Sequence, residues 1–358
     1  MNRAARATID TAALRANLSA ARDASGGARV MAVIKANAYG HGIVPTARAL
    51  AGADAFAVAR MEEATAIREA GLTQRLILLE GVFHAEQLEQ AASLEAELVV
   101  HSPEQMEMLE QYEGRHRFPV WLKIDTGMNR LGFPPERAPE LERRLAACAS
   151  VSGSPRLMTH LASADAKSDP VTPAQIRRFT EATAGMAGER SIANSAGVMA
   201  WPESHSDWVR PGIMLYGVSP FEGRCGTDLG LRPVMTLASE LIAIKRVPSG
   251  GRVGYGGVWT ASRETRIGVA AIGYGDGYTR HLRSGTPVLV RGKIAPLAGR
   301  ISMDLITLNL EEVPEAKVGD EVTLWGEGLP VERLARNAGT IPYELLCGVT
   351  QRVAMRLV

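Results

Sequence analysis

Short apolar segments alternate with amphipathic segments from residue 30 to residue 217. Each apolar segment has the length and continuous hydrophobicity of a buried strand, and we place these strands at 30–35, 54–59, 75–80, 97–101, 119–125, 156–162, 190–194 and 213–217. Amphipathic helices are expected between them, among others at 61–70, 84–94, 103–112 and 173–186. This alternation predicts an α/β fold with a (β/α)8 TIM-type barrel, because an open doubly wound sheet normally has fewer strands.

The pattern changes after the barrel segment. Turn-forming residues gather at 217–230, and short β-type segments follow at 236–247, 266–272, 287–291, 305–310 and 321–324, with a helix at 330–338. We therefore predict a barrel domain over residues 1–225 and a mostly β C-terminal domain over residues 226–358. Residues 1–9 are expected to end in a strand that joins the second domain, and Asp10 is expected to cap the following helix.

Composition limits the partners and the compartment. The formal net charge of +1 leaves no field to gather nucleic acid or an anionic membrane, so neither partner is expected. The three cysteines are scattered without CxxC spacing, which predicts neither disulfides nor a metal site. No apolar run reaches the roughly 18 residues of a membrane span, and no apolar signal core opens the chain, so we expect a cytoplasmic protein.

A lysine ends the first barrel strand. The run Val30–Ile34 is apolar, and Lys35 is followed by the small-residue, glycine-rich sequence ANAYGHG. Such a lysine can extend its amine to solvent, which is the commoner structural role. Desolvation can instead lower its pKa and make a neutral amine that forms a Schiff base. Lysine is scarce in this chain, yet Lys123 also ends an apolar strand.

Polar residues follow several of the predicted strands at the barrel end where active sites lie. They are Lys35 and Tyr39 after strand one, Lys123, Asp125 and Arg130 after strand five, His160 at the end of strand six, Asn194 and Ser195 after strand seven, and Arg210, Gly212 and Ile213 around the start of strand eight. Alone, each has a structural alternative: a helix cap for Ser195, an ion pair for Arg210, a core histidine for His160.

Together these residues suit pyridoxal phosphate. The cofactor needs a lysine, anchors for its phosphate and a partner for its ring nitrogen. Ser195 and the N–H groups of Gly212 and Ile213 would form the phosphate cradle. Arg210 as the nitrogen partner cannot accept a proton, which leaves the ring a weaker electron sink and favours racemisation over transamination.

Tyrosines stand among glycines in the second domain. The segments are VGYGG at 253–257, IGYGDGY at 272–278 and GRISMD at 299–304. The glycines can belong to hairpin turns, and GYGDG lacks the ligand spacing of a calcium loop. Tyr255 would act as a base at neutral pH only beside a cation or histidine, because a phenol normally has a pKa near 10.

The motifs AVIKANAYGHG, LKIDTGMNRLG, ANSAG, RPGIMLYG, VGYGG and GRISMD, in this order, resemble those of the alanine racemase family. These are fold-type III pyridoxal-phosphate enzymes with a (β/α)8 barrel and a C-terminal β domain. The resemblance implies interconversion of L-alanine and D-alanine by a two-base mechanism. Lys35 would hold the cofactor and act on the D side, and Tyr255 from the other subunit of a homodimer would act on the L side.

The resemblance also assigns the remaining site residues. Arg210 would face the pyridine nitrogen, and His160 would tune the tyrosine base. Cofactor binding, mainly to the phosphate, would fall to Tyr39, Asn194, Ser195, Gly212, Ile213 and Tyr343. Arg130 and Met303 would contact the cofactor phenolate and the substrate carboxylate. Lys123 would be a carbamylated lysine that orients Arg130, and the access corridor would contain Tyr274, Arg280 and Arg300.

One position departs from part of the family. Some members have a histidine that supports the pyridine arginine where this chain has Ser191, which leaves the network behind Arg210 undefined. The runs RPGIMLYGVSP and SIANSAG resemble the catabolic branch. Two alternatives stay open: a broader amino-acid or serine racemase, and a non-catalytic pyridoxal-phosphate homeostasis protein, although the latter class has a bare barrel.

Overall fold

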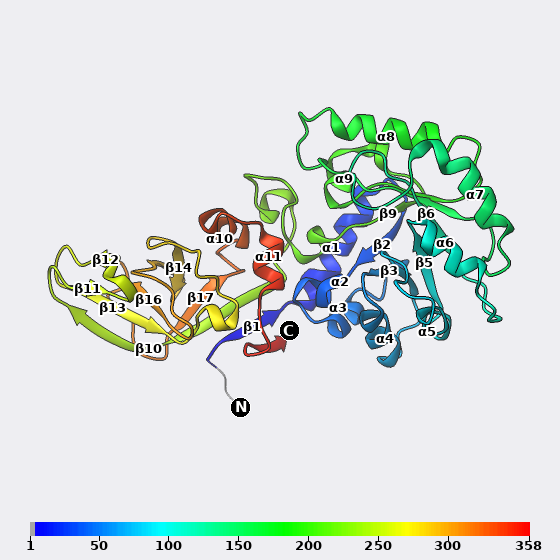
Figure 1. Cartoon of the computed structure of the whole chain (residues 1–358). Coiled ribbons are helices and arrows are strands. Elements are labelled where there is room, and N and C mark those ends of the chain that lie inside the picture. Colours follow the sequence, from blue (N-terminus) through cyan, green and yellow to red (C-terminus); the bar gives the residue numbers. More distant parts are fainter. Residues whose placement is uncertain (1–3) are drawn as a thin grey trace.

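A closed parallel barrel forms one lobe of the molecule (Figure 1). The structure, a computed structural model, describes residues 4–358. The barrel strands, in order around the barrel, are β2 (Arg29–Val33), β3 (Ala55–Val58), β4 (Arg75–Leu78), β5 (Ala96–Val100), β6 (Val120–Lys123), β7 (Arg156–Met158), β8 (Arg190–Ser191) and β9 (Trp208–Val209). The predicted barrel is thus confirmed.

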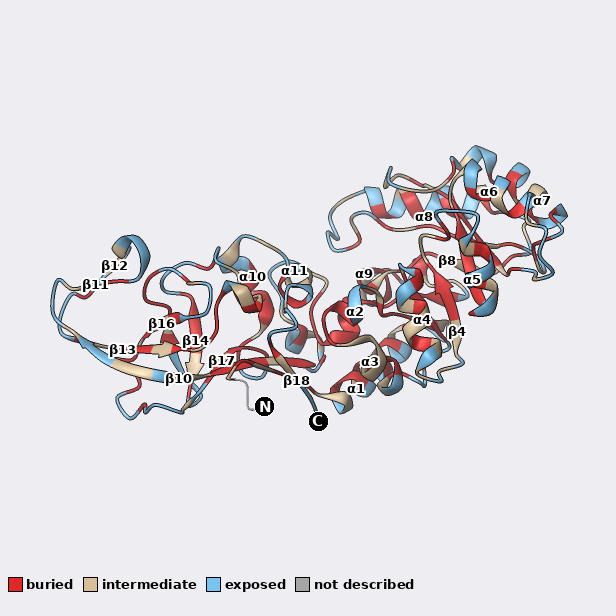
Figure 2. Ribbon diagram, turned by 60° about the horizontal axis from the view of Figure 1, so that its bottom comes forward, coloured by how far each residue is buried: buried red, intermediate tan, exposed pale blue. Residues whose placement is uncertain are grey.

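Helices surround this barrel. They are α1 (Thr11–Ala24), α2 (Lys35–Tyr39), α3 (Ile43–Ala49), α4 (Met61–Glu69), α5 (Gln87–Ser93), α6 (Pro103–Glu110), α7 (Ala138–Ala147), α8 (Val171–Ala182) and α9 (Ser195–Ala200). Buried residues follow the barrel strands and the inward faces of the helices (Figure 2). The Asp10 side chain accepts the N–H of Ala13 at 2.9 Å, which confirms the predicted cap of α1. Within the described part of the chain, no helix is long and apolar enough to cross a membrane.

The eighth strand was predicted in the wrong place. The strand that closes the barrel is Trp208–Val209, which pairs with β8 and β2, whereas Ile213–Tyr216 forms a 3-10 turn. A short buried apolar run has no periodicity that separates a strand from a turn or helix, and Ile213–Tyr216 is completely enclosed without being part of the sheet. Arg210 and Gly212 therefore follow the last strand and do not precede it.

The second lobe is built on a mixed β-sheet. Its central path runs β15 (Lys293–Pro296), β14 (Pro287–Val290), β17 (Glu321–Trp325), β10 (Met235–Val247), β1 (Arg6–Ile9) and β18 (Ala354–Leu357), while β13 (Thr265–Ala270) pairs with β10 and with β16 (Ile306–Asn309). The first strand of the chain thus lies in the second lobe. The helices are α10 (Val331–Ala338) and α11 (Pro342–Cys347).

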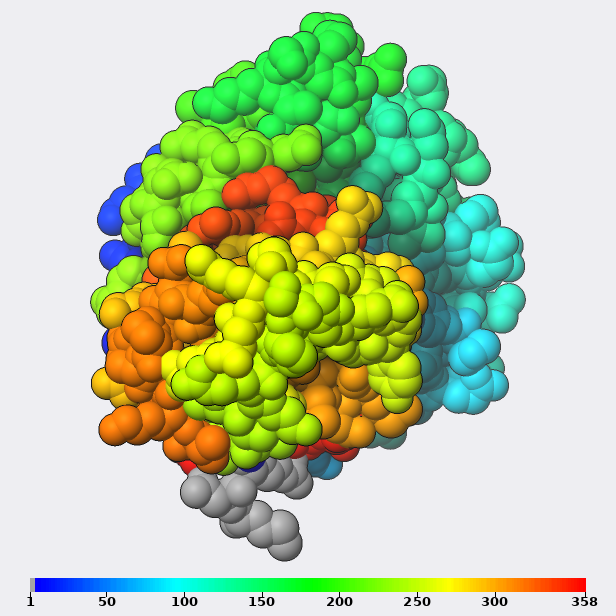
Figure 3. All heavy atoms as spheres, turned by 90° about the vertical axis from the view of Figure 1, so that its left-hand side faces the viewer, coloured from blue at the N-terminus to red at the C-terminus, as the bar shows by residue number. Residues whose placement is uncertain are grey.

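A small hairpin lies at the end of this lobe away from the barrel. It consists of β11 (Arg252–Val253) and β12 (Trp259–Thr260), which pair antiparallel, and both Figure 1 and Figure 2 place it at the far end. Viewed from that end, residues of the β10–β13 region face the viewer and the barrel lies behind (Figure 3).

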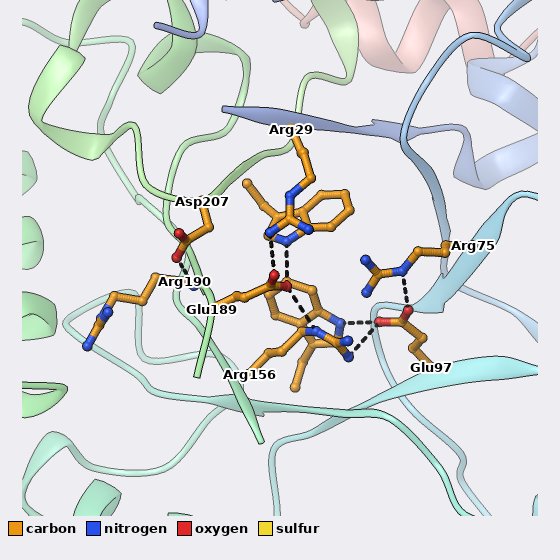
Figure 4. Close-up of polar contacts among 9 residues, drawn as sticks. Arg29, Arg75, Glu97, Arg156, Glu189, Arg190 and Asp207 are labelled. Atoms are coloured by element: carbon orange, nitrogen blue, oxygen red, sulfur yellow. Dashed lines mark hydrogen bonds and ion pairs between the residues drawn. The ribbon is translucent and has the colours of Figure 1, made fainter. Parts of the chain in front are cut away.

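An ionic network closes the amino ends of the barrel strands (Figure 4). Glu97 accepts hydrogen bonds from Arg75 at 2.6 Å, Arg156 at 3.3 Å and the Trp121 indole at 2.8 Å. Glu189 binds Arg29, Arg156 and the Trp208 indole, whose ring lies under the Arg29 guanidinium at 4.2 Å. In this barrel type the amino-terminal face serves stability, which leaves the opposite rim for chemistry.

Candidate active site

Lys35 opens a short left-handed turn directly after β2. The φ angles of Ala36, Asn37, Ala38 and Tyr39 lie between 52° and 54°, a conformation that costs about 1–2 kcal/mol per residue for L-amino acids. Within the turn Ala38 N–H donates to Ile34 at 2.9 Å, and Gly40 N–H donates to Ala36 at 3.1 Å. Consecutive non-glycine residues in this region persist only where the surroundings impose them, and they concentrate at functional sites.

The amine of Lys35 is partly withdrawn from water. Burial lowers its pKa and nearby Arg130 lowers it further, while Glu80 and Glu63 act in the opposite direction. The side chain therefore does not have the freely solvated amine of a surface lysine. A lowered pKa increases the neutral fraction that can attack a carbonyl group.

The turn is also a close junction between the two lobes. A Cβ on Gly40 would lie 2.1 Å from the Leu346 carbonyl oxygen in α11. From the same helix Tyr343 approaches Tyr39, with ring centroids 5.9 Å apart. The second lobe therefore contributes directly to the surroundings of Lys35 within one chain.

Tyr39, Ser195 and Gly212 meet on the rim. The Ser195 hydroxyl accepts the Gly212 N–H at 2.8 Å, and a Cβ on Gly212 would lie 2.6 Å from the Tyr39 hydroxyl oxygen. Burial raises the pKa of Tyr39, so its hydroxyl keeps its proton and can donate. Ile213 follows at the start of the 3-10 turn. Hydroxyls and backbone N–H groups brought this close suit an anionic oxygen group.

Asn194 is the N-cap of α9. Its side-chain oxygen accepts the Gly197 N–H at 3.0 Å, and its amide donates to Leu161 at 3.3 Å. Ser195 is therefore the first residue of α9 and not its cap. The Asn194 side chain is occupied in shaping the helix start, while the Ser195 hydroxyl turns toward Gly212.

Arg210 is buried, with 4% of its surface exposed. It donates to Ser191 Oγ and the Thr159 carbonyl, each at 2.6 Å, and to the Ile192 carbonyl at 3.2 Å. Among residues 4–358 no carboxylate forms an ion pair with it, and burial lowers its pKa to about 10. Ser191 also donates to the Trp208 carbonyl at 2.9 Å, which fixes its hydroxyl beside Arg210. Ser191, which stands where some racemases have a histidine, therefore supports the arginine itself.

His160 and Lys123 lie beside this arginine. His160 Nδ1 is 3.3 Å from Arg210 Nη2, and burial together with the charges of Arg210 and Lys123 lowers the histidine pKa. A neutral His160 can accept from Arg210 through Nδ1. Burial and the cations Arg210, Arg130 and Lys35 also lower the pKa of Lys123, to about 8. Lys123, Arg130 and His160 line one recess.

Asp125 organises the turn that delivers Arg130. Its Oδ1 accepts the N–H groups of Gly127, Met128 and Asn129 at 2.9–3.0 Å. The sequence analysis placed Asp125 on the rim but gave it no role. An aspartate directly before a turn often accepts the N–H groups of the next residues along the chain. Its position before the glycine at 127 is the local signal by which this turn-stabilising role could have been predicted.

The other predicted site residues belong to the second lobe. Tyr255 connects β11 to β12 and is 65% exposed, with the Arg300 guanidinium next to its neighbour Gly256. Tyr274 lies 5.8 Å from the Arg280 guanidinium, and its N–H donates to Ser302 at 3.0 Å.

Met303 joins this group through its backbone and is itself 53% exposed. Its carbonyl accepts the Gly275 N–H at 2.9 Å, so the loop with Tyr274 lies against the loop with Met303. Arg352, which the sequence analysis missed, forms ion pairs with Asp276 and Asp304 on these two loops. Among residues 4–358, no hydrogen bond or ring contact joins Tyr255, Tyr274 or Met303 to Lys35.

Pyridoxal phosphate fits the rim on structural grounds. A Cβ at Gly212 would collide with the Tyr39 hydroxyl, the Lys35 amine is partly desolvated, and Arg210 is a buried cation with no anionic partner among the described residues. These features match the three parts of the cofactor in turn: the phosphate, the aldehyde and the ring nitrogen. The fold and the rim therefore define a barrel enzyme of the pyridoxal-phosphate class.

Comparisons with known proteins identify the family. The model of the alanine racemase N-terminal domain matches residues 9–220, and that of the alanine racemase C-terminal domain matches residues 234–357. The chain is 50% identical to an alanine racemase of Aeromonas hydrophila subsp. hydrophila over 356 residues, covering 99% of this chain and 100% of the relative. It is 52% identical to one of Nitrosococcus oceani over 347 residues, covering 97% of each.

Solved structures agree with this assignment. The biosynthetic alanine racemase of Pseudomonas aeruginosa superposes with a TM-score of 0.96 at 43% identity, and an alanine racemase of Acinetobacter baumannii superposes with a TM-score of 0.93 at 37% identity; each match covers 100% of both chains. The chain belongs to the alanine racemase family, a family of pyridoxal-phosphate-dependent isomerases. The resemblance to the catabolic branch stays a prediction.

Proposed function

We propose that this chain interconverts L-alanine and D-alanine with Lys35 and Tyr255 of the partner subunit as opposed proton carriers. The observation that carries the proposal is the separation of the two groups within one chain. Lys35 is partly buried at the barrel rim, whereas the segment Tyr255–Gly257 joins the hairpin strands at the far end of the second lobe. A second copy of the chain can supply the missing group.

Several residues would hold the cofactor. Tyr39, Ser195, Gly212, Ile213 and Tyr343 would contact the phosphate, with Asn194 fixing the start of α9. Arg210 would face the ring nitrogen from its bonds to Ser191 and Thr159. When bound, pyridoxal phosphate supplies an electron sink that makes the α-proton of an attached amino acid acidic.

Proton transfer would then fall to groups on opposite faces of the α-carbon. Lys35 Nζ would remove or return the proton on the D side, and Tyr255 of the partner subunit would do so on the L side. Removal on one face and return on the other inverts the configuration. Arg210 keeps its charge and cannot accept a proton from the ring nitrogen, so the ring would be a weak electron sink. A weak sink favours racemisation over transamination.

Lys123 is a candidate for carbamylation. Its pKa of about 8 leaves part of the amine neutral near physiological pH. A neutral amine adds carbon dioxide to give a carbamate and a proton. The new carboxylate would lie among Arg210, Arg130 and Lys35, which surround Lys123 with positive charge. It would offset this charge and orient Arg130 toward the phenolate of the cofactor and the substrate carboxylate.

Substrate access would be controlled by the second lobe. Met303 would contact the substrate carboxylate region, and Tyr274, Arg280 and Arg300 would line the corridor. The contact between Tyr274 and Arg280 and the packing of Gly275 against Met303 support a narrow, ordered entrance. The matched C-terminal domain favours an enzyme over a bare-barrel binding protein. Racemisation assays over a panel of L-amino acids distinguish alanine racemase from a broader racemase.

The domain limits and the homodimer form one proposal. Residues 1–225 would carry the cofactor lysine, and residues 226–358 would give the second base to the partner. In support, Tyr255, Val258 and Met303 of the second lobe are all exposed large apolar side chains. A second copy of the chain packed against this end of the lobe would cover them, because contiguous apolar surface is typical of a protein interface.

Mixed subunits test the shared site. Lys35→Ala and Tyr255→Phe each remove one proton carrier, so each homodimer should be nearly inactive. A heterodimer keeps one intact site, and activity should reappear after the two variants are mixed under conditions that exchange subunits. Tagged purification of the heterodimer provides the control. A purified heterodimer without activity contradicts the shared-site proposal.

A further inference from the structure

His41 is completely buried beside the left-handed turn that begins with Lys35. Its Nδ1 atom lies 3.0 Å from the Ala38 carbonyl oxygen and 2.9 Å from the Tyr39 carbonyl oxygen. Both carbonyls belong to residues with positive φ. The imidazole therefore contacts the backbone of the turn at Ala38 and at Tyr39, whose hydroxyl lies next to Gly212 in the proposed phosphate cradle.

The two partners define the protonation of the ring. Both are acceptors, so Nδ1 must carry the hydrogen and donate to both oxygens. Burial lowers the pKa of His41 to about 4, and the ring is accordingly neutral at physiological pH. Nε2 is buried and has no hydrogen-bond partner in the described part of the chain. The single N–H of this ring is thus committed to the turn.

Aromatic contacts connect His41 to the backbone on both sides of Lys35. The His41 ring is 4.6 Å from the Tyr216 ring, which in turn stacks on Tyr39 at 4.7 Å. The Tyr216 hydroxyl donates to the carbonyl of Val33, the last residue of β2, at 3.1 Å. Tyr216 therefore contacts the backbone two residues before Lys35, and His41 contacts it three and four residues after Lys35.

We propose that His41 is a positioning residue that imposes the left-handed turn and thereby directs Lys35 and Tyr39 to one cofactor. Its Nδ1–H donates to the Tyr39 carbonyl and to the Ala38 carbonyl, which also accepts the backbone N–H of His41 at 3.0 Å. Its ring fills the space against Tyr216. The inference rests on the proposed role of Lys35, and no contact of His41 with cofactor or substrate is implied.

The test separates the hydrogen bond from simple packing. In His41→Asn the side-chain amide nitrogen can occupy the place of Nδ1 and donate, whereas His41→Gln has the same amide one methylene further out. His41→Leu fills a similar volume with no donor. The readout is the rate at which each apoenzyme attaches pyridoxal phosphate at Lys35, measured by borohydride trapping and identification of the labelled peptide.

We expect attachment by His41→Leu and His41→Gln to be about tenfold slower than wild type, the effect of losing one well-placed hydrogen bond. His41→Asn should recover most of the rate, and its affinity for the cofactor should stay close to that of wild type. If His41→Leu does not fold, the comparison of His41→Asn with His41→Gln decides the question. Circular dichroism and thermal unfolding monitor the fold of every variant.

Two outcomes overturn the proposal. Attachment at the wild-type rate in His41→Gln and His41→Leu means that the N–H does not position Lys35. Equal loss in His41→Asn and His41→Gln means that the ring acts only through packing. Failure of the proposed function is distinguishable, because the wild-type enzyme itself would then attach no cofactor at Lys35.

Discussion

Gly212→Ala tests whether the rim is shaped around a phosphate. The added Cβ would lie 2.6 Å from the Tyr39 hydroxyl oxygen and 3.3 Å from the Cζ atom of that ring. Contacts between carbon and oxygen below 3.0 Å force one partner to move. Gly212 has a φ of −122° and a ψ of −90°, so the experiment has to separate this contact from the backbone preference of alanine.

Tyr39 has little room to withdraw. Its ring stacks on Tyr216 at 4.7 Å and faces Tyr343 at 5.9 Å, and only 8% of its surface is exposed. Overpacking of a well-packed site costs about 1–3 kcal/mol. If this cost falls on the cofactor-bound state, the dissociation constant of pyridoxal phosphate should rise by about 5- to 150-fold.

The assay is equilibrium binding of pyridoxal phosphate to apoenzyme, combined with a double-mutant cycle. Tyr39→Phe removes the closest oxygen, so Gly212→Ala should weaken binding less in the Tyr39→Phe background than in the wild type. Gly212→Ala with unchanged affinity would refute the cradle. An equal loss in both backgrounds would show that Tyr39 is not the group displaced.

Three further predictions concern residues around the rim and the opposite face. Ser191→Ala removes the 2.6 Å hydrogen bond to Arg210, so kcat/KM should fall about tenfold. Ser191→Thr, which keeps a hydroxyl, is the control. An alanine variant as active as the wild type would contradict the supporting role of Ser191. The amount of carbamate at Lys123 should increase as pH rises through about 8, the pKa of this amine. The measurement is the 13C signal of the carbamate formed from labelled bicarbonate, which Lys123→Ala should lack. A signal that persists in Lys123→Ala would place the carbamate on another residue. Partial burial opposes ionisation of Glu189, but bonds from Arg29, Trp208 and Arg156 lower its pKa to about 2. Its stabilising effect is therefore present above the unfolded pKa of about 4.3 and lost as pH falls toward 2, so the melting temperature of Glu189→Gln should decline less than that of wild type between about pH 5 and pH 3.

The barrel and most rim residues could be predicted from the sequence because buried parallel strands leave a strong periodic signal. The strand that contains Leu76 and Ile77 is continuous, apolar and short, and it lies where it was expected. The run Ile213–Tyr216 has the same composition but is buried by α1 and the stacked tyrosines, outside the sheet. Burial alone therefore does not separate strand from turn.

Long-range contacts were beyond sequence analysis. Nothing local indicates that Ser191 lies 2.6 Å from Arg210, 19 residues later in the chain. The glycine-rich turn after Lys35 was predicted, but its left-handed form was not, because alanine and tyrosine rarely adopt positive φ. Arg352 forms ion pairs with Asp276 and Asp304, which are 76 and 48 residues away in the sequence, so no local pattern predicts these contacts.

The charge of the rim links the separate proposals. Burial lowers the pKa values of Lys35 and Lys123, and each of these amines also feels the charge of Arg130. Arg210 adds a buried cation, while Glu80 raises the pKa of both amines and Glu63 raises that of Lys35. An arrangement with this excess of positive charge is stabilised by anions, and the phosphate, the substrate carboxylate and a carbamate on Lys123 would each supply one. For Lys35 itself, burial is the main factor that disfavours the protonated amine, because the largest charge effect on it comes from Glu80, which raises its pKa.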